Sequence, residues 1–183
     1  MTDEETKYDA VIVGAGVSGL FMFYKLKNMG LSVLVIEKSD ELGGTWNWNR
    51  YPGARCDIPS LEYSYQFDEE LQQEWSWSEK YSAGPEILEY LNHVADKFDL
   101  KDYINFEEEV IQAKFNEDSC LWSVSTNKQK YVTKFCIFAT GCLSIPNKPE
   151  IPGLELFEGE LLHTATWPRE EQNFRGKNVA IIG

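Results

Sequence analysis

A glycine-rich turn near the start of the chain is the feature that most constrains its fold. Residues 10–13 read AVIV, an apolar run typical of a buried strand, and residues 14–19 follow as GAGVSG. Apolar side chains then recur at helical spacing from Val17 to Leu26, and Gly30 supplies a helix stop signal. A G-x-G-x-x-G that follows a strand and opens a helix is typical of the dinucleotide-binding turn of a Rossmann unit.

Each glycine of this turn has a separate task. Gly14 allows the tight turn, Gly16 lets a pyrophosphate approach the backbone, and Gly19 lets helix and strand pack closely. The phosphates would lie at the helix N-terminus, which carries partial positive charge. We therefore expect Gly14, Gly16, Ser18 and Gly19 to contact a dinucleotide; the alternative is a glycine-rich turn without a ligand.

A second strand completes the unit. Residues 32–36 (SVLVI) form an apolar, β-rich run, and Glu37 follows directly, 18 residues after Gly19. A carboxylate at this place accepts hydrogen bonds from ribose hydroxyls and would repel a 2′-phosphate. The first site is therefore expected to prefer FAD or NAD to NADP.

One helix and three strands are predicted between Glu37 and the proline-rich segment that begins after Leu143. Pro85 stands at a favoured first position of a helix, and the apolar residues that follow it recur at helical spacing. Residues 110–115, 121–126 and 131–138 have the composition of strands, and short polar turns separate them.

The last part of the chain indicates a domain boundary. The sequence is proline-rich after Leu143, and residues 176–183 (GKNVAIIG) repeat the polar, apolar, glycine pattern of residues 8–14. We expect a nucleotide-binding domain over residues 1–142, a linker over 143–175, and the first strand of a truncated second Rossmann domain over 176–183. The sequence is accordingly interpreted as the N-terminal part of a longer protein.

Charge and cysteine content argue against several classes of protein. Asp and Glu total 30 against 17 Lys and Arg, a net charge of −13, so nucleic acid and anionic membranes are poor partners. The four cysteines form no C-x-x-C, which argues against a zinc site. No signal peptide and no run of 18 apolar residues is present. We expect a cytoplasmic protein with free thiols and no metal, of unknown oligomeric state.

Two longer motifs carry a family resemblance. Residues 43–57 read GGTWNWNRYPGARCD and residues 157–168 read FEGELLHTATWP. Both match fingerprints of the type I Baeyer–Villiger monooxygenases, which the chain resembles over essentially its whole length. The segment Phe135–Gly141, which ends in Ala-Thr-Gly, resembles the strand that returns to the FAD sheet in flavoproteins that bind two dinucleotides. The resemblance implies an α/β fold: a Rossmann-like FAD-binding domain with a small β-sheet excursion, followed by the start of an NADPH-binding domain.

The same resemblance implies a function. Such an enzyme uses FAD and NADPH to insert one atom of O₂ beside the carbonyl of a small ketone, through a C4a-peroxyflavin, and yields an ester or lactone. An N- or S-oxygenating flavin monooxygenase stays open as an alternative. A non-catalytic flavin-binding fragment is the alternative if the chain ends at Gly183. Residues 1–183 alone are expected to bind FAD weakly and to show no turnover.

The motifs also imply site residues by position. Asp57 and His163 are the candidate catalytic residues. The resemblance implies that Asp57 pairs with an active-site arginine beyond Gly183, and that His163 couples the position of the linker to cofactor binding. The alternative for Asp57 is capping of a turn. The other residues expected near FAD are Gly44, Thr45, Trp46, Arg55, Cys56, Tyr63 and, through backbone contacts to adenine, Val110.

Overall fold

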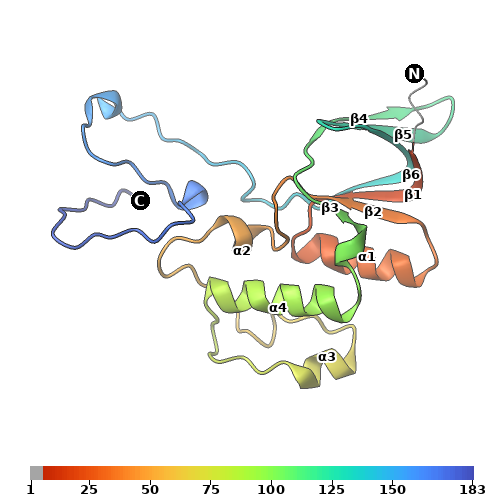
Figure 1. Cartoon of the computed structure of the whole chain (residues 1–183), viewed down its shortest axis with the longest axis horizontal. Helices are drawn as coiled ribbons and strands as arrows, with labels where there is room; N and C mark the ends of the chain where they lie inside the picture. The colour runs from red at the N-terminus through yellow and green to blue at the C-terminus, as the bar shows by residue number, and fades with distance from the viewer. Residues whose placement is uncertain (1–5) are drawn as a thin grey trace.

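One mixed sheet organises the chain, with its strands in the order β3-β2-β1-β6-β5-β4 (Figure 1). The computed structural model describes residues 6–183. β1 lies between β2 and β6 and is parallel to both, and β3 is parallel to β2; β5 is antiparallel to both β6 and β4. The strands are β1 (Thr6–Val13), β2 (Val33–Ile36), β3 (Ile104–Asn105), β4 (Val110–Asn116), β5 (Leu121–Thr126) and β6 (Lys130–Phe138).

The crossover predicted from the glycine turn is confirmed. α1 (Val17–Asn28) begins directly after Gly16, and the chain leaves the helix through Gly30, whose φ of 78° lies in the left-handed region. Every residue of β2 is buried, as expected for a parallel strand covered on both faces.

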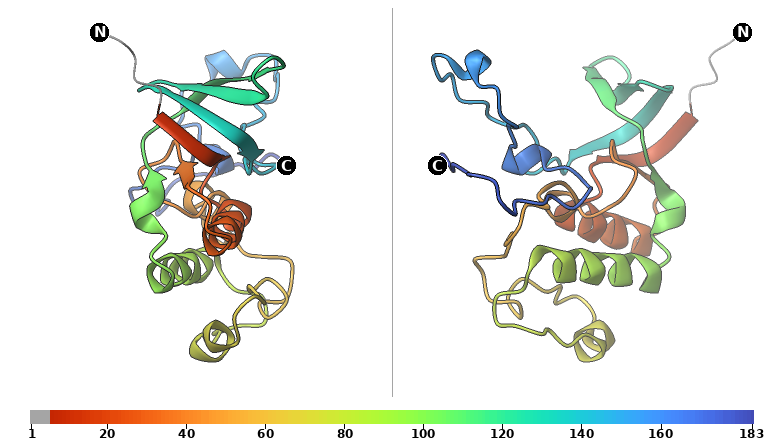
Figure 2. Two further views of the ribbon diagram at one scale, coloured as in Figure 1. Left: turned by 90° about the vertical axis from the view of Figure 1, so that its right-hand side faces the viewer. Right: turned by 60° about the vertical axis from the view of Figure 1, so that its left-hand side comes forward.

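The remaining helices follow β2. They are α2 (Thr45–Trp48), α3 (Glu69–Glu74), α4 (Gly84–Lys97) and the 3₁₀ turns η1 (Lys101–Tyr103), η2 (Leu154–Leu156) and η3 (Thr164–Thr166). Pro85 lies in the first turn of α4, and Ile87, Leu91 and Val94 are buried along one side of it, which confirms the predicted amphipathic helix. α1 and α4 lie on the same side of the sheet (Figure 2).

The core has two parts because β1 is buried on both faces. The larger cluster joins Ile12 of β1 to Leu20 of α1 and Leu91 of α4. The smaller cluster joins Val11 to Tyr131 of β6 and to buried residues of β2 and β5. Neighbouring residues of a strand point to opposite faces, so Val11 and Ile12 anchor the two clusters.

The predictions for later elements succeed in part. The three predicted strands are present as β4, β5 and β6, and β6 returns to pair with β1 as expected. β3, α2 and α3 were not predicted. Residues 176–183 form no strand in the described part of the chain, because no neighbouring strand pairs with them there. Their assignment to a second domain stays a prediction.

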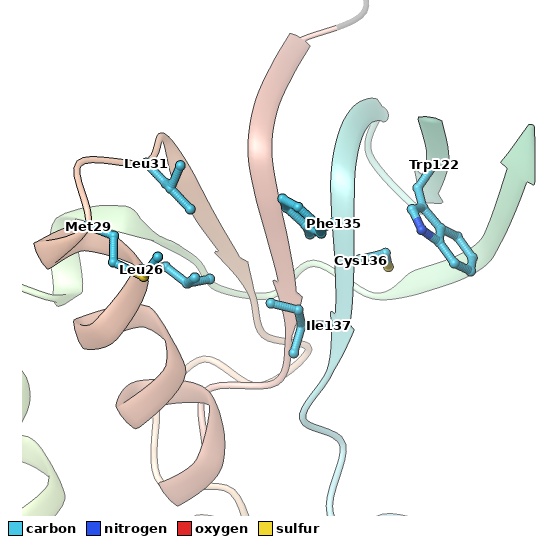
Figure 3. Close-up of a pocket in the computed structure, with 7 residues that line it drawn as sticks. All are labelled: Leu26, Met29, Leu31, Trp122, Phe135, Cys136 and Ile137. Carbon is cyan, nitrogen blue, oxygen red and sulfur yellow. The ribbon is translucent and has the colours of Figure 1, made fainter. Parts of the chain in front are cut away.

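An apolar hollow of about 340 Å³ lies where the end of α1 faces β6 (Figure 3). Met29 is 72% exposed and Phe135 is 55% exposed there. The hollow lies at the end of α1 that is remote from the glycine turn. Its lining residues are Leu26, Met29, Leu31, Trp122, Phe135, Cys136 and Ile137.

Candidate functional site

The carboxyl ends of the four parallel strands β3, β2, β1 and β6 lie at one edge of the sheet, and the glycine turn lies at this edge. The Gly14 N–H donates to the Ile36 carbonyl at 2.8 Å, and the Ala139 N–H donates to the Val13 carbonyl at 2.9 Å. β2 and β6 flank β1 on opposite sides, so the order of strands reverses here. Ligands of open α/β sheets bind in the crevice outside such a switch point.

Two glycines of the turn have no room for a side chain. A Cβ on Gly19 would lie 1.9 Å from the carbonyl oxygen of Gly14. A Cβ on Gly14 would lie 2.6 Å from the carbonyl oxygen of Ala139, and the φ of 105° at Gly14 is left-handed. The packing expected of these glycines is therefore present, and it fixes the helix start against β1 and β6.

The N-terminus of α1 is open to a ligand. Gly16 is the N-cap residue and offers no side chain to the first N–H groups of the helix, and the first turn contains no acidic residue. Ser18, in the same turn, is exposed. Free N–H groups and the partial positive charge of a helix start attract an anion. These features fit a diphosphate.

A second glycine pair packs against this turn. The Gly43 N–H donates to the Ala15 carbonyl at 3.0 Å. Gly44 has a φ of 52°, and a Cβ on it would lie 2.9 Å from the Cα of Gly16. Thr45 begins α2 directly afterwards. Gly44 and Thr45 are thereby placed beside the start of α1, where the phosphates are expected.

Glu37 is a buried carboxylate that holds the loops around it. Its Oε2 accepts from the Ala15 N–H at 2.8 Å, and its Oε1 accepts from the Ser39 N–H at 2.9 Å. Each carboxylate oxygen has two lone pairs, so one on each remains for a ribose hydroxyl. The Glu108 N–H donates to the Glu37 carbonyl at 3.0 Å, which brings the start of β4, and with it Val110, to the end of β2.

Trp46 and Tyr63 form a hydrogen-bonded aromatic pair. The Trp46 indole N–H donates to the Tyr63 hydroxyl at 3.0 Å, and the rings meet edge to face at 87°. Burial raises the pKa of Tyr63, while the Trp46 hydrogen bond opposes this rise. The Tyr63 hydroxyl therefore stays protonated at neutral pH, and its proton has no acceptor among residues 6–183. It is a free donor for a ligand.

The residues of the Arg-Cys-Asp segment differ in their surroundings. The Arg55 guanidinium forms an ion pair with Glu79 at 2.6 Å and also donates to the Tyr81 carbonyl. Cys56 is buried, and its N–H donates to the Ser82 carbonyl. Asp57 is exposed, and its carboxylate accepts no hydrogen bond from the described residues. The described residues thus give no hydrogen bond of the kind that the turn-capping alternative needs, and the role of Asp57 stays a prediction.

His163 ties two parts of the linker together. It is the N-cap of η3, where its Nδ1 accepts from the Ala165 N–H at 3.1 Å. Its Nε2 lies 3.2 Å from the Asn147 carbonyl oxygen, which requires a proton on Nε2. Both ring nitrogens are thus engaged by the backbone, so the geometry suits a positioning role better than proton transfer.

The second fingerprint folds on itself and meets the first. The Phe157 ring folds back over Gly159, where a Cβ would lie 2.5 Å from its Cζ, although this exposed ring could move aside. Trp167 and Pro168 line a hollow of about 290 Å³ together with Arg50 and Pro52 of the first fingerprint. The two motifs therefore meet, although Arg50 and Trp167 are more than a hundred positions apart in the sequence.

Three buried polar residues of this region were not predicted. Ser39 and Asn47 are linked, because the Asn47 amide Nδ2 donates to the Ser39 hydroxyl at 2.7 Å. The Tyr65 hydroxyl donates to the Val17 carbonyl at 2.6 Å and so holds the start of α1. Polar residues inside a motif-rich loop were the only signal in the sequence, and it does not identify their partners.

Residues 6–183 contain neither a candidate metal cluster nor a candidate membrane span. No group of three or more His, Cys, Asp or Glu side chains there is placed to hold a metal ion. Within the same residues, no helix has the length and apolar character needed to cross a membrane. All four cysteines are free thiols.

Comparisons with known proteins agree with this geometry. The model of the pyridine nucleotide-disulphide oxidoreductase family matches residues 11–183. An acetone monooxygenase (methyl acetate-forming) from Gordonia sp. (strain TY-5) is 44% identical over 179 residues, which cover 97% of this chain and 34% of that protein. A Baeyer–Villiger monooxygenase from Pseudooceanicola batsensis is 44% identical over 178 residues, 96% of this chain and 32% of its own length.

A solved structure shows the same fold. The oxidized steroid monooxygenase bound to NADP superposes with a TM-score of 0.88 at 47% identity, over 93% of this chain and 33% of that one.

A relative with a different printed activity is also similar in sequence. A phenazine N-monooxygenase from Lysobacter antibioticus is 37% identical over 183 residues, 99% of this chain and 34% of its own length. The chain spans about one third of the length of these relatives.

Proposed function

The chain belongs to the pyridine nucleotide-disulphide oxidoreductase family, and from this we propose that it forms the FAD-binding part of a Baeyer–Villiger monooxygenase. The complete enzyme would use FAD and NADPH, take a small ketone and O₂, and form an ester or lactone. A cytoplasmic location is part of the same proposal. The observation that carries the proposal is that the two fingerprints meet, while Gly43 and Gly44 of the first pack against the glycine turn.

The chain's own residues would bind and orient FAD. The start of α1, with Gly16 and Ser18, would hold the diphosphate, while Gly44 and Thr45 would close over it. Glu37 would accept hydrogen bonds from the ribose hydroxyls. FAD supplies the redox chemistry when bound, and the protein supplies position and electrostatics.

The aromatic pair would shape the reacting end of the site. Tyr63 keeps a free hydroxyl proton to donate, and Trp46 fixes that hydroxyl in place. Trp46 is 9% exposed, so the pair also forms an apolar wall that excludes water. Arg55 is engaged with Glu79, so we assign to Arg55 the task of fixing the backbone beside Cys56 and Asp57.

Asp57 would position a cation for the reaction. Its carboxylate is exposed, and no described residue donates to it, so it is available to a partner outside this chain. An arginine held by Asp57 would place positive charge where negative charge develops on oxygen. Asp57 is therefore a positioning residue in this proposal.

Replacement of Asp57 tests the proposal. In the complete enzyme, Asp57→Ala should lower ester formation from a cyclic ketone about 100-fold, because misplacement of a charged group costs that much. FAD content, read from the flavin absorbance, should not change. Asp118→Ala, in an exposed turn, is the matched control. Full ketone oxidation by Asp57→Ala would remove Asp57 from the mechanism.

Oxidation at nitrogen is a second candidate. The similarity to a phenazine N-monooxygenase over 99% of this chain favours it. Product analysis separates the two candidates. The first predicts a lactone from a cyclic ketone, whereas the second predicts an N-oxide from a heteroaromatic compound with a ring nitrogen. An N-oxide as the sole product would replace the ketone proposal.

A further inference from the structure

An ion pair fastens the linker to the end of β2. Arg169 directly follows the Trp-Pro of the second fingerprint, and its guanidinium pairs with the carboxylate of Asp40. The two residues are 129 positions apart. Asp40 comes three residues after Glu37, so the contact joins the linker to the loop that carries the expected ribose acceptor.

Ser39 connects this ion pair to Glu37. The Ser39 N–H donates to Glu37 Oε1 at 2.9 Å, and the Ser39 hydroxyl donates to Asp40 Oδ1 at 3.1 Å. The hydroxyl also accepts from the buried Asn47 amide at 2.7 Å. Ser39 is only 4% exposed, so it is held in one place and transmits the position of Glu37 to Asp40.

Arg50 supports the linker from the other side. Its Nε donates to the Asn47 carbonyl at 2.7 Å, which ties Arg50 to the same network. Arg50, Trp167 and Arg169 all line the hollow between the two fingerprints. Burial lowers the pKa of Arg50, and the nearby Arg169 charge adds to this. Asp40 thus offsets a repulsion between two arginines and holds Arg169 in place.

We propose that Asp40 and Arg169 form a latch that positions the linker, and that FAD bound at Glu37 tightens it. The second half of this statement rests on the proposed function. A ribose on Glu37 would restrict that carboxylate and, through Ser39, restrict Asp40. Coupling of this kind is reciprocal, so loss of the latch should weaken FAD binding by the same factor by which FAD tightens the latch.

The first test measures the latch in the complete enzyme without cofactor. Hydrogen exchange of the backbone amides of residues 164–175 should rise about two- to five-fold in Asp40→Asn and in Arg169→Gln, the range for an exposed ion pair. The double variant should exchange no faster than either single variant. The swap Asp40→Arg with Arg169→Asp should restore protection, and 1 M salt should remove the difference.

Arg175→Gln is the matched control, because the Arg175 side chain forms no ion pair or hydrogen bond with residues 6–183. Its exchange should equal that of the unmodified chain. Unchanged exchange in Asp40→Asn and Arg169→Gln, or effects that add in the double variant, would overturn the latch.

The second test adds FAD to the complete enzyme, with binding followed by flavin fluorescence. Saturating FAD should slow the exchange of residues 164–175 further in the unmodified protein but not in Arg169→Gln. The FAD dissociation constant of Arg169→Gln should rise by the same factor by which FAD slows exchange in the unmodified protein. Equal protection by FAD in both proteins would overturn the coupling. Absence of FAD binding would contradict the proposed function instead and leave the first test to decide the latch.

Discussion

At the residue scale, a single glycine in a helix can be required by packing even though helix propensity disfavours it. Gly19 lies inside α1, where replacement of glycine by alanine normally stabilises a helix by about 1 kcal/mol. Here the added methyl group would meet the Gly14 carbonyl oxygen at 1.9 Å. Backbone atoms cannot move aside as a flexible side chain can. The steric clash therefore outweighs the gain in helix propensity, and the replacement lowers the stability of the protein.

Gly19→Ala should therefore destabilise the protein by about 3 kcal/mol or more, the upper range for overpacking. The free energy of unfolding in urea measures this. Gly30→Ala is the comparison: it has open space around it but a φ of 78°, so it should cost only about 1–2 kcal/mol. Equal losses in the two variants would show that backbone conformation, not the Gly14 contact, sets the cost.

At the scale of elements, a buried polar cluster joins the β3–β4 connection to β5 and β6. Glu108 is 2% exposed, and its carboxylate accepts from the Tyr131 hydroxyl at 2.9 Å and from the Thr126 hydroxyl at 2.6 Å. Asn105 of β3 donates to it at 3.0 Å. The donors satisfy a buried charge and fix the connection that leads to Val110.

Alkaline pH should weaken this cluster. Burial raises the pKa of Tyr131 to about 12, and the Glu108 carboxylate adds to the rise. An unfolded tyrosine titrates near 10. A pKa raised on folding gives stability below the unfolded value, so stability should fall as the pH rises from about 10 to about 12.

Tyr131→Phe should remove that part of the pH dependence and cost about 1–3 kcal/mol at neutral pH, because Glu108 loses a donor. Urea unfolding at pH 8, 10 and 11 measures both effects. Tyr103→Phe, on an exposed residue, should leave the profile unchanged. If the stability of Tyr131→Phe depended on pH as that of the unmodified protein does, Tyr131 would not be the cause of the loss of stability at alkaline pH.

Elements defined by their own sequence were predictable, and elements defined by distant partners were not. α1, α4 and β6 have clear periodicity or composition. β3 has only two residues, and its pairing with β2 defines it. For the same reason the glycine motif indicated the cofactor turn, whereas the Asp40–Arg169 pair and the Glu108 cluster join residues whose approach depends on the folded sheet.

At the scale of the molecule, two surfaces of the described residues stay uncovered: the candidate site around Asp57 and the apolar hollow beside Phe135. Asp57 has no partner among residues 6–183, and Phe135 is 55% exposed beside the hollow of Figure 3. The chain also spans only about one third of its relatives. Under the proposed function, these are the surfaces at which the rest of the complete enzyme would close the cofactor site.

Residues 1–183 alone should therefore bind FAD at least about tenfold more weakly than the complete enzyme, a difference of about 1.4 kcal/mol. Quenching of flavin fluorescence on titration of FAD measures both affinities. No NADPH-dependent turnover is expected from the 183 residues. Steady NADPH oxidation coupled to ester formation by this chain would contradict the prediction.

The pairing of β1 with β6 has a consequence for how the chain reaches its native state. Contacts such as Lys134 with Asp9 close a loop of 125 residues, and such long-range closure slows folding. During synthesis β1 must wait until β6 has left the ribosome, and only then does Ala139 back the glycine turn. A binding site at the glycine turn can therefore form only after β6 has been synthesised and has paired with β1.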